Sequence, residues 1–124
     1  MDTMELKSTN GTPTVRFGED GRLVIKGRSI AENVRDFYQF LNVWGGKLHI
    51  QKLVVEVDLD YMNSTSSKNL LYFFRVLDAN QNIGKITVNW YYEMGDEDSL
   101  SKGQIFSESM HKAKFRYHLH MDGI

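Results

Sequence analysis

Two stretches of alternating apolar and polar residues, 53–61 and 85–92, constrain the fold more than any other feature of the chain. Such alternation is typical of strands with one buried and one exposed face. The segment between them, 66–79, has apolar residues at helical spacing, so a strand–helix–strand order is predicted. The buried positions expected are Val55, Val57, Leu59 and Tyr61 in the first strand, Ile86, Val88, Trp90 and Tyr92 in the second, and Leu70, Phe73, Phe74 and Leu77 in the helix.

Further elements are expected on both sides of this unit. Short β-prone runs at 15–17 and 23–25 flank an Asp-Gly turn, which favours a hairpin. Because crossovers between parallel strands are right-handed, all helices should cover one face of the sheet. The expected order is ββαβαβαβ, a two-layer α/β domain with a mixed sheet of about five strands, which resembles the STAS type of anti-sigma-factor antagonists. The remaining elements are a helix from near Ala31 that ends at Gly45-Gly46, a helix over 97–110 and a strand over 114–120.

Length and composition limit the number of domains, the classes of partner and the cellular location that can be expected. We expect a flexible tail over residues 1–12 and a single domain over 13–124. The net charge of −1 gives no reason to expect nucleic acid or an anionic membrane as a partner. The absence of cysteine excludes disulfides and thiolate metal sites. With no apolar run long enough to span a bilayer and no signal-peptide pattern, a cytoplasmic location is expected.

Four hydroxyl residues in succession, Ser64 to Ser67, stand where the first long strand meets the following helix. One interpretation is helix capping, since Ser and Thr at this position stabilise a helix by roughly 0.5–2 kcal/mol. Capping does not require four hydroxyls, however. The second interpretation is phosphorylation, because unpaired amides and the helix dipole favour an anion at a helix start.

The exposed side of this helix is a candidate docking surface beside the hydroxyls. If Leu70, Phe74 and Leu77 are buried, then Tyr72, Arg75 and Val76 should face outward. A phosphate of about −2 charge at the helix start would disfavour a partner bound over this surface.

The segment Tyr61-Met62-Asn63-Ser64-Thr65-Ser66-Ser67-Lys68 resembles the Tyr-x-Asn-Thr-Ser-Ser-x-Lys signature of SiaC family regulatory phosphoproteins. Two further segments agree with that family. They are Gly27-Arg28-Ser29-Ile30-Ala31-Glu32-Asn33, and Asn89-Trp90-Tyr91-Tyr92 followed by Asp96-Glu97-Asp98.

The resemblance implies a non-enzymatic regulator in a partner-switching pathway. A serine/threonine kinase of the GHKL type would phosphorylate the residue after the motif Asn, and a PP2C-like phosphatase would remove the phosphate. The unphosphorylated form would bind and activate a diguanylate cyclase, raising cyclic-di-GMP and promoting biofilm formation. The family's acceptor is Thr and the matching position here is Ser64, with Thr65 as the alternative; Tyr61, Asn63, Thr65, Ser66 and Lys68 would form the acceptor loop.

Other functions find less support in the sequence. Asp58 and Asp60 lack the further residues of a receiver-domain Mg²⁺ site, and His118 and His120 lack a third zinc ligand. No acid–base or nucleophile set points to an enzyme, and no cofactor or metal is expected. The alternative from another class is a sensor domain in which the hydroxyl cluster binds a small anion without covalent change.

Overall fold

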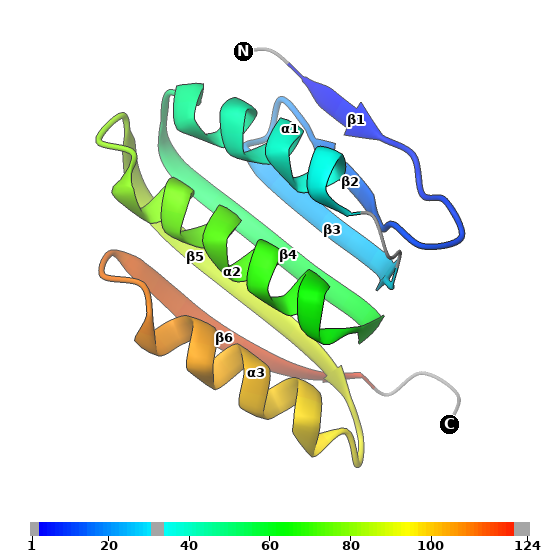
Figure 1. The fold of residues 1–124 in the computed structure, drawn as a ribbon. Helices are drawn as coiled ribbons and strands as arrows, with labels where there is room; N and C mark the ends of the chain where they lie inside the picture. Colours follow the sequence, from blue (N-terminus) through cyan, green and yellow to red (C-terminus); the bar gives the residue numbers. More distant parts are fainter. Residues whose placement is uncertain (1–2, 31–33, 121–124) are drawn as a thin grey trace.

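The computed structural model describes residues 3–30 and 34–120, which form one sheet covered on one face by helices (Figure 1). The predicted class, a mixed α/β sheet with helices on a single side, is confirmed, with six strands instead of about five. In chain order the elements are β1 (Met4–Leu6), β2 (Thr14–Phe17), β3 (Arg22–Ser29), α1 (Arg35–Lys47), β4 (Ile50–Met62), α2 (Ser64–Ala79), β5 (Ile83–Glu93), α3 (Glu97–Glu108) and β6 (Ala113–His120).

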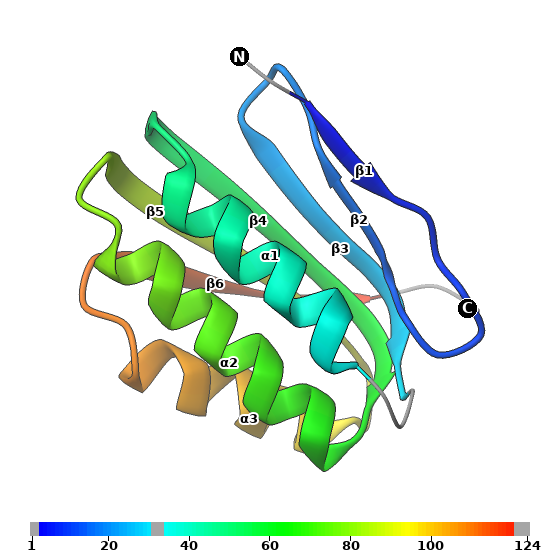
Figure 2. The ribbon, with the colours of Figure 1, turned by 45° about the horizontal axis from the view of Figure 1, so that its top comes forward.

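The strands lie in the sheet in the same order as in the chain, from β1 to β6. The first three strands are antiparallel neighbours, and β3 to β6 are parallel. Each parallel connection carries one helix, and Figure 2 shows the three helices packed side by side over the same face. All three helices therefore begin at the edge of the sheet where the parallel strands end.

The extra strand comes from the N-terminal stretch. Residues Met4–Leu6 pair antiparallel with β2, so the prediction of a tail without regular structure is wrong for this part of it. Met4 and Leu6 are half-buried and pack against the core, which gives this polar segment enough apolar contact to hold an edge strand.

Helix α1 continues through the two glycines that were expected to end it, and it stops at Lys47. Gly45 is buried, and a Cβ atom there would come within 2.9 Å of the Phe73 ring and 3.0 Å of Leu77. The glycine thus allows α1 to approach α2 closely. Glycine often ends a helix, so this packing role could not be predicted from the sequence. The predicted start near Ala31 lies outside the described residues; the described helix begins at Arg35 after Val34.

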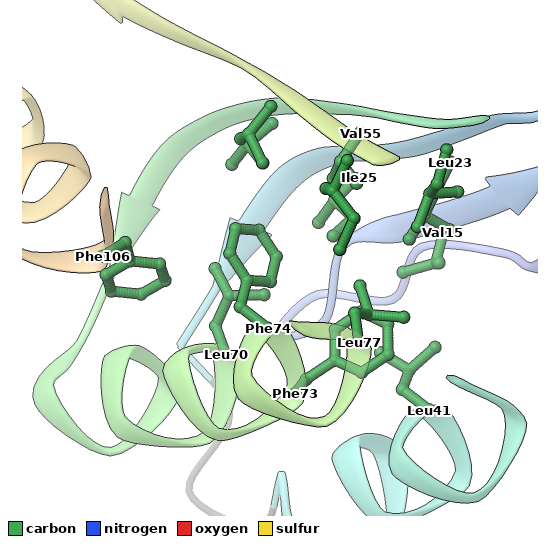
Figure 3. Close-up of a cluster of buried hydrophobic side chains, with 14 of the residues drawn as sticks. Val15, Leu23, Ile25, Leu41, Val55, Leu70, Phe73, Phe74, Leu77 and Phe106 are labelled. Atoms are coloured by element: carbon green, nitrogen blue, oxygen red, sulfur yellow. The ribbon is translucent and has the colours of Figure 1, made fainter. Parts of the chain in front are cut away.

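The core lies between the sheet and the helices (Figure 3). The predicted face of α2 is confirmed, since Leu70, Phe73, Phe74 and Leu77 are each 0% exposed. Trp90 of β5 meets Phe106 of α3 edge-on at 5.2 Å between ring centroids, and Phe106 meets Phe74 of α2 at 5.4 Å. This aromatic chain fixes α3 against the sheet and against α2.

A bulge near the end of β4 changes which residues face the core. Gly27 of β3 pairs with Leu59, but the next residue, Arg28, pairs with Tyr61, so Asp60 is an extra residue in β4. Beyond the bulge Met62 is buried and Tyr61 is 61% exposed. The prediction that Tyr61 lies on the buried face is therefore wrong, because strict alternation does not survive an inserted residue.

Candidate functional site

The turn from β4 into α2 is held by Asn63, which is the N-cap of the helix. Its Oδ1 accepts the amide hydrogen of Ser66 at 2.9 Å, and its carbonyl oxygen accepts that of Ser67 at 2.9 Å. Its own amide donates to Ser29 O at 3.1 Å, and Nδ2 donates to Ile30 O at 3.2 Å. Asn63 thus caps α2 and also ties it to the end of β3.

Because Asn63 is the cap, helix α2 begins at Ser64, two residues earlier than predicted. None of the four hydroxyls is the N-cap, so capping does not account for the cluster. The motif Asn, which sequence reasoning placed only in the acceptor loop, has the capping role.

The four hydroxyls have different surroundings. Ser66 is fully buried and accepts a hydrogen bond from Ser29 Oγ at 2.7 Å. Ser29 is also bonded to the Tyr38 hydroxyl at 2.8 Å, and burial raises the pKa of Tyr38 to about 12. The Ser67 oxygen is buried and has no hydrogen-bond partner among the described residues. These two hydroxyls face the interior, where a kinase could not reach them.

Ser64 and Thr65 are both exposed, at the first two positions of α2. Their amides lie in the first turn, whose N–H groups lack intrahelical acceptors. The first turn of α2 contains no acidic residue, whereas α3 begins with Glu97 and Asp98. The positive end of the α2 dipole is therefore not offset by a carboxylate of its own first turn, and it can stabilise an added anion.

A cation lies beside this turn that sequence reasoning did not single out. Lys102 of α3 donates to Met62 O at 3.1 Å and forms an ion pair with Asp98 at 3.2 Å. It lines a small cavity of about 150 Å³ between α3 and the end of β4, together with Leu59, Asp60, Tyr61, Met62, Trp90, Asp96, Asp98 and Ser99. The spacing of Asp98 and Lys102 indicates a helical ion pair, but only the fold brings Lys102 to the turn from β4 into α2.

The model of the SiaC family, described as SiaC family regulatory phosphoprotein, matches residues 6–120. The chain belongs to the SiaC family.

Solved structures agree with this assignment in fold. SiaC of Pseudomonas aeruginosa superposes with a TM-score of 0.81 at 22% identity, over 97% of this chain and 100% of that one. A chain from the crystal structure of the P. aeruginosa diguanylate cyclase SiaD in complex with its activator SiaC gives a TM-score of 0.81 at 22% identity, over 94% and 99%. Apo-SiaC from the same organism gives 0.78 at 22% identity, over 95% and 99%. No curated protein matches the sequence.

In this SiaC family member the expected docking residues differ in exposure. Tyr72 is 60% exposed and Arg75 is also exposed, as predicted. Val76 is only half exposed, and its Cγ1 lies 3.8 Å from where a Cβ on Gly46 would be. Val76 therefore lies close to α1, and Tyr72 and Arg75 are the exposed residues of the three expected to face a partner.

An exposed stripe of side chains begins in the SiaC family motif and continues along α2. Ser64, Lys68, Tyr72 and Arg75 follow one another at spacings of four, four and three residues, so they lie on one side of the helix. All four are exposed. Tyr61, displaced outward by the bulge, precedes this stripe at the end of β4.

The two histidines considered as zinc ligands, His118 and His120, form hydrogen bonds and ring contacts within the sheet. His118 Nε2 is 2.9 Å from Asn89 Oδ1, His120 Nε2 is 2.7 Å from Asp58 Oδ1, and both rings stack on Tyr91. Over the described ranges no three His, Asp or Glu side chains form a group suited to a metal ion. Likewise no described helix has the length and apolar character needed to cross a membrane.

Proposed function

We propose that this protein is a partner-switching regulator controlled by phosphorylation of Ser64. The observation that supports this most is that Ser64 is exposed in the first turn of α2 while Asn63 performs the capping that a hydroxyl would otherwise explain. Thr65 is the alternative acceptor, because it is equally exposed.

The proposed kinase is of the GHKL type and the proposed phosphatase is PP2C-like, as the family resemblance implies. In the unphosphorylated state the protein binds and activates a diguanylate cyclase, and it does so as a binding protein in the cytoplasm without enzymatic activity of its own. The complex of P. aeruginosa SiaC with the cyclase SiaD supports this choice of effector.

Release on phosphorylation follows from the position of Ser64 on the exposed stripe of α2. A phosphate there would add about −2 charge within one turn of Lys68 and at the end of the surface that carries Tyr72. The helix start tolerates the phosphate because its amides stabilise it. A partner packed on Tyr61 or Tyr72 would have to desolvate the same phosphate, which weakens the complex.

The test uses purified kinase, ATP and intact-mass measurement. Wild type is expected to gain one phosphate, Ser64→Ala to gain none, and Thr65→Ala to behave as wild type. Binding of the cyclase is then measured by calorimetry for the phosphorylated and unphosphorylated forms.

Two results would contradict the proposal. A phosphate that remains on Ser64→Ala but is lost on Thr65→Ala would move the acceptor by one residue. No covalent change, combined with saturable binding of inorganic phosphate that Ser64→Ala weakens, would instead support an anion sensor.

A further inference from the structure

The face of the sheet opposite the helices carries a cluster of basic side chains. Every second residue of each strand lies on this open face, since the residues between them are buried under the helices in β3, β4 and β5 and partly buried in β6. We call the cluster the basic corner; it consists of Arg22, Lys52, Lys85, Lys114 and Arg116. These are five of the chain's 15 Lys and Arg residues, in a protein of net charge −1.

Strand register brings the five together. Lys52 of β4 and Lys85 of β5 are direct partners. One row further along the strands, Arg22 of β3 and Lys114 of β6 lie in the same row, with Val54 and Thr87 between them. Arg116 lies two residues beyond Lys114 on β6. With neighbouring strands about 4.8 Å apart, the four strands present these charges over roughly 14 Å.

Little within the described structure neutralises this cluster. Arg22 pairs with Glu56 and with Asp20. The other four basic side chains are exposed and form no ion pair with a described residue. Lys52 and Lys85 are directly opposed, and like charges in such positions destabilise a sheet. The pair therefore does not contribute to the stability of the fold.

A hollow of about 320 Å³ adjoins the basic corner. It is lined by Lys52 and Lys85 of the corner and by their neighbours Gln51 and Gly84. A Cβ at Gly84 would come within 2.5 Å of Gln51 O, so a side chain could not be placed there without moving the strand. The glycine therefore lets β5 approach Gln51 of β4 closely beside the two lysines.

Acidic groups limit the extent of the basic surface. Glu56 lies on the same face in the row of Arg116, where it pairs with Arg22. Asp58 lies further along β4, where it pairs with His120. A duplex or a flat anionic membrane would extend over these carboxylates. A short acidic segment that lies across Lys52, Lys85 and Lys114 would not, because about ten residues of helix already span that distance.

We propose that the basic corner is a second docking surface, which binds an acidic segment of a partner protein by charge complementarity. It lies on the opposite layer from the exposed stripe of α2, so both surfaces can be occupied together. Its use does not depend on phosphorylation of Ser64.

The test measures fluorescence anisotropy of a labelled peptide of alternating Glu and Ala residues. The variant K52E/K85E removes the central pair of the corner. The matched control K7E/K47E changes the net charge equally at two exposed lysines outside the corner. Circular dichroism monitors folding, and K52Q/K85Q replaces the reversal variant if that one does not fold.

Wild type and Ser64→Ala should bind the peptide equally, and binding should weaken as salt rises from about 0.03 to 0.3 M. K52E/K85E should bind at least about tenfold more weakly, and the control should stay within about twofold of wild type. Equal weakening in both reversal variants, or no binding by wild type, would overturn the proposal. So would tighter binding of single-stranded DNA or of phosphatidylserine vesicles, if K52E/K85E abolished it.

Discussion

Asn63 Oδ1 accepts the amide hydrogen of Ser66 at 2.9 Å. Because of this bond, Asn63 caps α2, and the proposed phosphorylation falls on a different residue, Ser64. The amide side chain caps the helix and ties it to β3, so the exposed hydroxyl of Ser64 is not needed for stability. Modification of that hydroxyl can then change the surface without unfolding the turn that presents it.

Asn63→Ala should lower the free energy of unfolding by about 1–2 kcal/mol, because it removes the cap and the bond to Ile30 O. Asn63→Asp keeps the capping acceptor and loses only the Nδ2 donor, so it should cost less. Urea unfolding of the two variants beside wild type measures both changes. A cost for Ala no larger than that for Asp would show that the cap contributes little.

The buried hydroxyls of Ser29, Ser66 and Tyr38 lead to a prediction about alkaline pH. The folded state raises the pKa of Tyr38 from 10.0 to about 12, so the stabilisation it reflects is complete below pH 10. As pH rises from 10 to 12, the unfolded chain loses this proton first, and stability should fall by about 3 kcal/mol.

Other tyrosines and lysines titrate in the same range, so the measurement is the difference between wild type and Tyr38→Phe. The variant lacks the ionisable group, and its stability should decline less over this interval. Parallel curves for the two proteins would mean that Tyr38 does not titrate on unfolding.

Phosphorylation of Ser64 should itself stabilise the protein. The phosphate would lie at the positive end of α2 and one turn before Lys68, and these two interactions together contribute about 0.5–1 kcal/mol. Thermal unfolding of the phosphorylated and unphosphorylated forms measures the effect, which should shrink in high salt.

Lys68→Ala is the partner variant for this prediction. Phosphorylation should still stabilise it, but by less, because only the helix amides and dipole remain. A phosphorylated form that unfolds at lower temperature than the unphosphorylated one would place the phosphate away from the helix start.

The sequence predicted those parts of the fold that depend on repeated patterns. Alternation located β4 and β5, and helical spacing identified the buried face of α2. The register, by contrast, is set between strands, so the bulge that exposes Tyr61 could not be read from β4 alone. Likewise the cap at Asn63 was missed because four hydroxyls beside it offered the same chemistry.

The distribution of charge is a second feature that the sequence alone does not show. The net charge of −1 gave no reason to expect nucleic acid or an anionic membrane as a partner. Only strand register shows that five cations gather on the open face of the sheet, because they come from four separate strands. The position of Lys102 beside the turn from β4 into α2 depends in the same way on the packing of α3.

The two glycines of α1 offer a matched pair for testing how the helices pack. Gly45→Ala would place a Cβ 2.9 Å from the Phe73 ring and 3.0 Å from Leu77, in a buried contact between α1 and α2. Despite the better helix propensity of Ala, overpacking should make this variant less stable by about 1–3 kcal/mol. Gly46→Ala would meet only Val76 at 3.8 Å, an ordinary contact, so it should gain up to about 1 kcal/mol. Chemical denaturation of both variants measures the contrast, and a stabilised Gly45→Ala would show that the two helices can separate at little cost.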